Sequence, residues 1–160
     1  MKAPRYLALF AIMATPYLIH AQAAHETTSG KHSAKARLVG AWHLIHIDSP
    51  NPEGNSVAAP VPKGMLIYTR DGHMSVQLMY PKPSNTKSNE YVQDGYEASF
   101  GSYDVDEAKH TITHHVLGSV TGDRLVGRDL PRSYQFSSDG HLIIRSTNPA
   151  EHWSVTWEHY

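Results

Sequence analysis

The stretch Gly64–Tyr80, GMLIYTRDGHMSVQLMY, decides the fold, because it consists of two apolar-rich runs separated by an Asp-Gly turn. Such runs on either side of Asp-Gly predict a β-hairpin. A three-residue loop, Arg70–Gly72, with Gly72 in the left-handed conformation, pairs Tyr68 with Met74. A two-residue Asp-Gly turn is the alternative, and it would slip the register by one residue.

The three-residue loop is favoured because it separates apolar from polar side chains better. Alternate residues of a strand point to opposite faces, so the register decides which residues face inward. In the favoured register the inner face consists of Leu66, Tyr68, Met74, Val76, Leu78 and Tyr80. The outer face consists of Met65, Ile67, Thr69, His73, Ser75, Gln77 and Met79.

The rest of the chain after Gly40 is predicted to form six further short strands with turn residues between them. These strands are Ala41–Asp48, Glu97–Val105, Thr111–Gly118, Leu130–Phe136, His141–Ser146 and Trp153–His159. Eight antiparallel strands with hairpin connections favour an all-β, up-and-down barrel, which leaves no unpaired edge. A sandwich of two sheets is the alternative. Single helical turns are expected at residues 34–39, with Ser33 as the cap, and at residues 89–93.

The N-terminus has the features of a secretory signal. Lys2 and Arg5 precede an apolar run, and Ala21-Gln22-Ala23 follows it as a small-x-small cleavage site. We therefore predict a signal peptide over residues 1–23, a flexible leader over residues 24–36 and a barrel domain over residues 37–160. The protein would then be secreted or periplasmic, with no stable membrane span after cleavage. A retained N-terminal anchor helix is the alternative.

The charge and the cysteine content of the chain argue against several classes of function. The chain has 14 Lys and Arg residues against 15 Asp and Glu residues, and it has no basic stripe, so nucleic acid is not an expected partner. The chain has no cysteine, so disulfides, thiol nucleophiles and thiolate metal sites are excluded.

Several blocks of sequence in order resemble the lipocalin-like domain family over about residues 37–159. The blocks are Leu38–Trp42, Gly64–Met79, Phe100–Asp106, Thr113–Ser119 and Trp157-Glu158. The resemblance implies a calycin-type barrel. Relatives with similar barrels include both carriers and cofactor-free cyclases or isomerases.

Strand alternation predicts an apolar interior with a few polar tips, which is typical of a small-molecule pocket. Tyr103 is expected opposite Ile112, and Phe136 opposite Leu142. The predicted ligand-binding residues are His46, Tyr68, Tyr80, Tyr103, Arg132, Tyr134 and Trp157. An inward Arg132 needs an anion, because an unpaired buried charge is unfavourable. That anion is either Asp48, Glu97 or Asp104 of the chain, or an oxygen of a ligand.

His114 is the first candidate proton carrier and His46 the second, since histidine titrates near neutral pH. No metal site is expected, because His43 and His46, and likewise His114 and His115, should point to opposite faces of a strand. The leading hypothesis is an exported barrel that binds a small hydrophobic molecule. The alternative is a cofactor-free cyclase or isomerase of a secondary-metabolite (polyketide or terpenoid) pathway, using the same cavity. A module with a filled interior and no ligand is the third hypothesis.

Overall fold

The hairpin adopts the favoured register. Strand β2 (Lys63–Tyr68) pairs antiparallel with β3 (His73–Met79), and Tyr68 lies opposite Met74. Gly72 has a φ of +93°, which is the left-handed conformation that glycine adopts without steric penalty. Four residues of the predicted inner face, Leu66, Tyr68, Met74 and Leu78, are buried. The register with a two-residue turn is therefore excluded.

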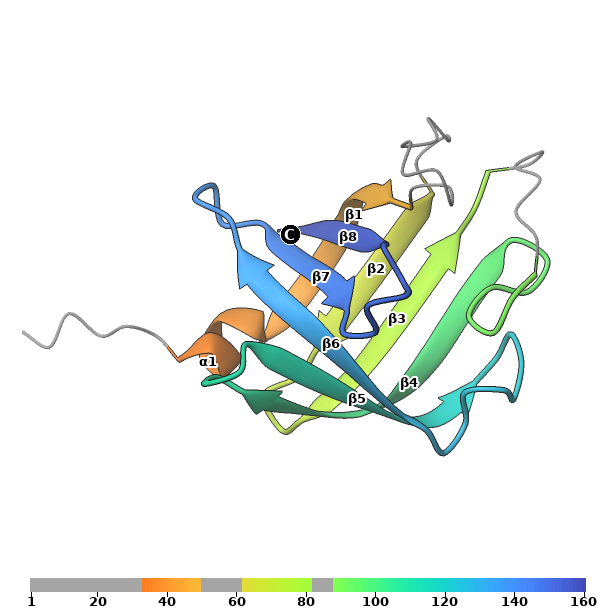
Figure 1. Ribbon diagram of the computed structural model, residues 1–160, viewed down its shortest axis with the longest axis horizontal. Coiled ribbons are helices and arrows are strands. Elements are labelled where there is room, and N and C mark those ends of the chain that lie inside the picture. Colours follow the sequence, from red (N-terminus) through yellow and green to blue (C-terminus); the bar gives the residue numbers. More distant parts are fainter. Residues whose placement is uncertain (1–32, 50–61, 82–87) are drawn as a thin grey trace, which may run out of the picture. The chain divides into compact units, whose positions relative to one another are not determined.

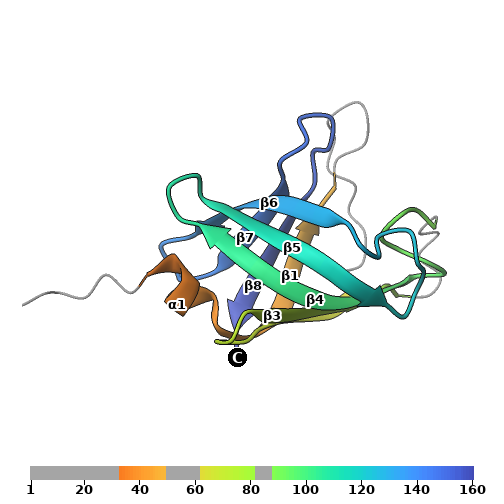
Figure 2. The same ribbon diagram turned by 90° about the horizontal axis from the view of Figure 1, so that it is seen from below.

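In the computed structural model, eight strands form a closed barrel in sequence order, and β8 closes it against β1 (Figures 1 and 2). The remaining strands are β1 (Gly40–Asp48), β4 (Tyr96–Asp106), β5 (Thr111–Ser119), β6 (Asp129–Phe136), β7 (Leu142–Ser146) and β8 (Ser154–His159). All eight neighbouring pairs are antiparallel. The predicted all-β up-and-down barrel is confirmed, and the two-sheet sandwich is excluded.

The structure describes residues 33–49, 62–81 and 88–160. These residues fall within the compact unit Lys31–Tyr160. The predicted signal peptide, residues 1–23, and most of the predicted leader, residues 24–36, lie outside the described residues. Within the described part of the chain, no helix is both long and apolar enough to cross a membrane.

The predicted N-terminal helical turn is present as α1 (Ala34–Leu38) and covers one end of the barrel (Figure 1). The Ser33 side chain accepts a hydrogen bond from the Ala36 backbone N–H and so caps the helix. Leu38 is fully buried in the barrel core, and the Trp42 indole N–H donates to its carbonyl at 2.8 Å. Two further contacts hold the helix, because Arg37 lies over the Phe136 ring at 3.7 Å and Lys35 over the Tyr103 ring at 5.7 Å.

The register between β4 and β5 differs from the prediction by two residues. Tyr103 lies opposite His114 rather than Ile112, because a four-residue loop, residues 107–110, connects the strands. This loop requires His110 at a φ of +52°, which a residue other than glycine seldom adopts. Since the shift is an even number of residues, every side chain keeps its predicted face.

The predicted inward orientation of His46 is wrong. A β-bulge between Leu44 and His46 moves His46 opposite Thr156 and leaves its side chain exposed, while Ile47 takes the inner position. His43 also lies on the outside, where its Nε2 is 3.0 Å from Glu158. The expectation that His43 and His46 point to opposite faces is therefore wrong as well.

The helical turn expected at residues 89–93 does not form. Instead, the Asn89 side-chain oxygen accepts hydrogen bonds from the backbone N–H groups of Tyr91 and Val92, at 2.7 and 2.9 Å. A side chain that bonds the backbone ahead of it competes with helix formation. This turn buries Val92 and brings Tyr91 against the core residues Val116, Leu125 and Leu130.

Candidate functional site

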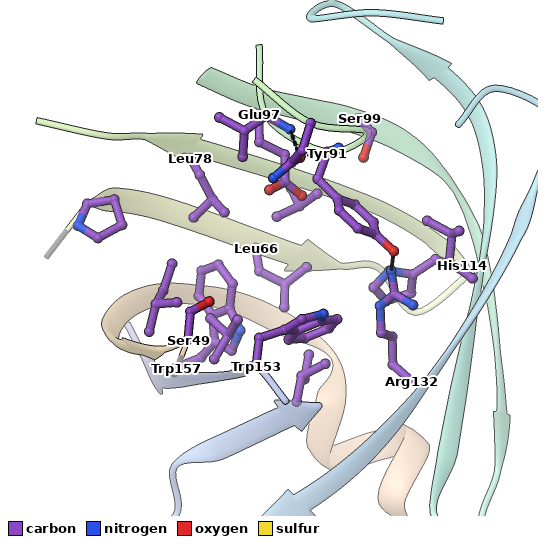
Figure 3. Close-up of a pocket in the computed structure, with 18 of the residues that line it drawn as sticks. Ser49, Leu66, Leu78, Tyr91, Glu97, Ser99, His114, Arg132, Trp153 and Trp157 are labelled. Carbon is purple, nitrogen blue, oxygen red and sulfur yellow. Dashed lines mark hydrogen bonds between the residues drawn. The ribbon is translucent and has the colours of Figure 1, made fainter. Parts of the chain in front are cut away.

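The barrel is filled at the α1 end and hollow at the other end. Near α1 the interior is packed with large side chains, including Tyr68, Tyr103 and Ile112. At the opposite end lies a cavity of about 370 Å³, within the size range of small-molecule sites. Its walls are mainly apolar and include Leu66 and Leu78, which Figure 3 labels. Val76, Val116, Ile144 and Val155 also belong to the apolar lining.

Arg132 supplies the positive charge of the cavity. It follows Pro131 in β6, and alternation along that strand turns its side chain inward, where it is 8% exposed. The guanidinium donates to the Tyr91 hydroxyl at 3.2 Å and to the Pro131 carbonyl at 3.0 Å. It also lies 5.4 Å from the centre of the Tyr91 ring and 5.1 Å from that of Trp153. Figure 3 shows both aromatic rings beside it.

No ion pair joins Arg132 to a carboxylate among the described residues. Of the three carboxylates considered from the sequence, Asp48 lies opposite Ser154 and does not line the cavity. Asp104 lies on the outer face and contacts His115 at 3.0 Å. Glu97 lines the same cavity as Arg132 but lies beyond ion-pair distance. The two acceptors that Arg132 does contact are both neutral.

Glu97 is the acidic residue of the cavity. It lies near the start of β4, opposite Leu78, and faces the cavity together with Ser99 (Figure 3). Burial raises the pKa of Glu97 to about 7, and the positive charge of Arg132 limits the rise. Glu97 therefore changes its charge near neutral pH.

His114 lines the cavity at its inner end, beside the tyrosines of the filled half. Its Nε2 forms a hydrogen bond of 2.7 Å with the Tyr68 hydroxyl. Burial, together with the positive charges of Arg132 and His115, lowers the pKa of His114 to about 3. His114 is therefore a neutral imidazole at physiological pH and has no imidazolium proton to donate.

Four of the predicted site residues meet at the cavity. These are Tyr80, His114, Arg132 and Trp157. Tyr80 directly follows β3 and continues its inner face. Burial raises the pKa of Tyr80 to about 12, and the negative charge of the nearby Glu97 adds to the rise. Trp157 is buried in the wall, and its indole N–H has no hydrogen-bond partner among the described residues.

The other predicted site residues do not line the cavity. Tyr68 points inward but stands behind His114, and Tyr103 donates its hydroxyl hydrogen to the Thr69 carbonyl at 2.9 Å. Tyr134 packs against His110 and Phe136. These three tyrosines belong to the filled half of the barrel, and His46 lies outside the barrel.

Three residues that line the cavity, Glu97, Tyr91 and Trp153, were not among the predicted site residues, although Glu97 was considered as a partner for Arg132. Glu97 could have been found, because alternation from Tyr103 places every second residue back to Glu97 on the inner face. Trp153 was also recoverable, since it alternates with Trp157 along the last strand. Tyr91 could not, because it lies in a turn whose position depends on tertiary contacts.

His114 and His115 point to opposite faces, as expected. His115 lies between two carboxylates on the outer surface, with its Nδ1 2.6 Å from Asp129 and its Nε2 3.0 Å from Asp104. Within the described residues, no group of three or more His, Cys, Asp or Glu side chains is arranged so that it could hold a metal ion.

The fold is a closed antiparallel barrel with a mainly apolar cavity at one end, and an eight-stranded barrel is wide enough to hold one small ligand. The family model of the lipocalin-like domain matches residues 39–159, a range that includes all eight strands. The chain belongs to the lipocalin-like domain family. The comparison with curated proteins finds no match.

Proposed function

We propose that this protein is exported and binds a small, largely hydrophobic molecule in the cavity at the open end of its barrel. The observation that carries the proposal is a cavity of about 370 Å³ with mainly apolar walls in an otherwise well-packed barrel. Protein interiors are close-packed, and an unfilled space of this size forfeits packing energy. A ligand that fills it regains those contacts and removes its own apolar surface from water.

The polar groups of the cavity are few and lie at defined places, which is the arrangement that orients a ligand. Arg132, Tyr91 and His114 lie close together, whereas Glu97 is on β4 beyond ion-pair distance of Arg132. Export is supported by the signal-like residues 1–23 in the sequence. Export and ligand binding can both be tested on one sample of the purified protein.

Mass spectrometry of the protein purified from the cells that make it naturally tests both parts. The mature chain is expected to begin at Ala24, and denaturation is expected to release a small apolar compound in an amount close to one molecule per chain. A chain that retains Met1 and is recovered from inside the cell would contradict export, whereas a chain that retains Met1 outside it would indicate the anchor helix. Absence of any released compound, together with failure to bind an apolar dye, would contradict ligand binding.

The same experiment bears on the alternative of a cofactor-free cyclase or isomerase. Release of two isomers that the purified protein interconverts would favour that alternative. Glu97, with its pKa of about 7, is then a better proton carrier than His114, which stays neutral down to about pH 3.

A further inference from the structure

Arg132 is a buried cation that forms no ion pair among the described residues, although its positive charge acts at longer range on the carboxyl groups of Glu97 and Glu151. Its guanidinium group has five N–H donors, and its two hydrogen bonds go to a phenol oxygen and a peptide carbonyl, both neutral. Within the described ranges no carboxylate lies within 4.0 Å of it. A desolvated charge without a counter-ion is unfavourable, so this site favours any bound group that brings a negative charge.

The surroundings of Arg132 restrict where such a group can bind. Tyr91 and Trp153 stand beside the guanidinium, and β6 lies behind it with Pro131 accepting one N–H. The remaining approach is from the cavity that Arg132 lines. The planar fork of a guanidinium matches the two oxygens of a carboxylate, which makes this approach selective for a planar oxyanion.

From this geometry, and on the basis of the proposed function, we infer that the ligand is an apolar molecule with a single oxyanion head, a carboxylate or an enolate, held by Arg132. The apolar part then lies against the walls formed by Leu66, Val76 and Val155. The Tyr91 hydroxyl, already bonded to Arg132, is placed to donate to the same head.

Glu97 limits the charge that the cavity accepts. It shares the cavity with Arg132, and when it is ionised it opposes a second negative charge on the ligand. The groups that face this region are Arg132 from β6, Tyr80 at the end of β3, Tyr91 from the turn before β4, and His114 from β5. Glu151, in the loop before β8, also interacts with Arg132, and hydrogen bonds from Ser146, Trp153 and Asn148 lower its pKa, so it is ionised at neutral pH. At neutral pH the tyrosines and His114 are uncharged, so Glu97 is the group among these that titrates. Binding of the anion is therefore expected to weaken as pH rises through about 7.

The test compares dodecanoic acid with dodecan-1-ol, which has the same chain and no charge. Each displaces an environment-sensitive apolar dye from the mature chain. A charge-assisted hydrogen bond contributes about 1.5–3 kcal/mol, so the acid should bind ~10–100-fold more tightly than the alcohol. This comparison uses the unaltered protein and does not depend on the folding of a variant.

Two variants test whether Arg132 causes the preference for the acid over the alcohol. Arg132→Gln is expected to lose the preference for the acid while it keeps binding of the alcohol and the dye. Arg145→Gln is the matched control, because Arg145 lies on the outer face of the neighbouring strand β7 and is exposed. This control should keep the preference unchanged.

The outcomes separate the two proposals. Equal affinity for acid and alcohol, or a preference that survives in folded Arg132→Gln, overturns the oxyanion inference and leaves apolar binding standing. Failure of the dye, the acid and the alcohol to bind overturns both proposals. Preference for the acid that disappears with Arg132 supports both.

Discussion

His114 and Glu97 line the same cavity, yet burial moves their pKa values in opposite directions. In each case burial favours the neutral form, because the charged form would have to exist away from water. For His114 the unfolded chain takes up a proton below about pH 6.5 that the folded chain does not, so its contribution to stability falls as pH is lowered. For Glu97 the folded chain holds a proton that the unfolded chain releases, so its contribution falls as pH rises from about 4.5 to about 7.

The substitution His114→Gln tests the neutral state of this histidine. Glutamine does not titrate and keeps a hydrogen-bonding group near Tyr68. Between about pH 6.5 and pH 3, the wild type should lose up to ~1.4 kcal/mol of unfolding free energy per pH unit relative to the variant. Urea unfolding of both proteins at several pH values measures the difference, and the contribution of Glu97 cancels because both contain it. A difference that does not change with pH would show that His114 is protonated in the folded protein as readily as in the unfolded one.

At the scale of the strand, the bulge in the β4–β5 pair depends on Gly101. The register shifts between Phe100 and Gly101, and the Gly101 backbone approaches β5 closely. A Cβ built on Gly101 would lie 1.9 Å from the His115 carbonyl oxygen, which is backbone and has no side-chain rotamer to relieve the clash. Any residue larger than glycine must therefore push the two strands apart.

We expect Gly101→Ala to destabilise the protein by at least ~1–3 kcal/mol, the usual effect of forcing atoms into a packed site. Gly122→Ala is the control, because its Cβ would meet Gln93 at an ordinary 3.5 Å and its effect should stay within about 0.5 kcal/mol. Urea midpoints of the two variants supply the comparison. Equal midpoints would mean that the barrel tolerates separation of β4 and β5 at this point.

Some of the loops and bulges between the strands could be predicted from the sequence, and others could not. The Arg70–Gly72 loop and the loop before His141 were predictable, because Asp-Gly supplies a left-handed residue at the required place, and the expected pairs Tyr68–Met74 and Phe136–Leu142 form. The β4–β5 loop was not predictable, because its left-handed residue is His110 and not a glycine that would mark the position in the sequence. The β1 bulge was not predictable either, and it alone reversed the orientation of His46.

For the site, alternation along the strands identified Arg132, His114, Tyr80 and Trp157, but it could not tell the filled half of the barrel from the hollow half. Tyr68, Tyr103 and Tyr134 face inward as predicted, and packing near α1 then uses them to fill the interior. That division depends on how side chains from all eight strands meet. Strand periodicity carries no information about it.

At the scale of the whole barrel, the two ends differ in how their interior is filled. The α1 end is closed by Leu38 and by an aromatic core that includes Tyr68 and Tyr103. The other end contains a cavity, which Arg132 and Glu97 line together with mainly apolar side chains. A stable half that supports an unfilled half is the arrangement expected of a binding protein rather than of a purely structural module.

The most direct test of this account is a titration with an apolar, environment-sensitive dye on the wild type, Val76→Trp and Gln77→Trp. Val76 lines the cavity, and Gln77 is its exposed neighbour on the outer face of β3. We predict that the dye binds the wild type and Gln77→Trp with similar affinity, and that Val76→Trp, folded but with its cavity filled, binds at least ~10-fold more weakly. Equal binding to all three proteins would place the dye outside the barrel and contradict the account.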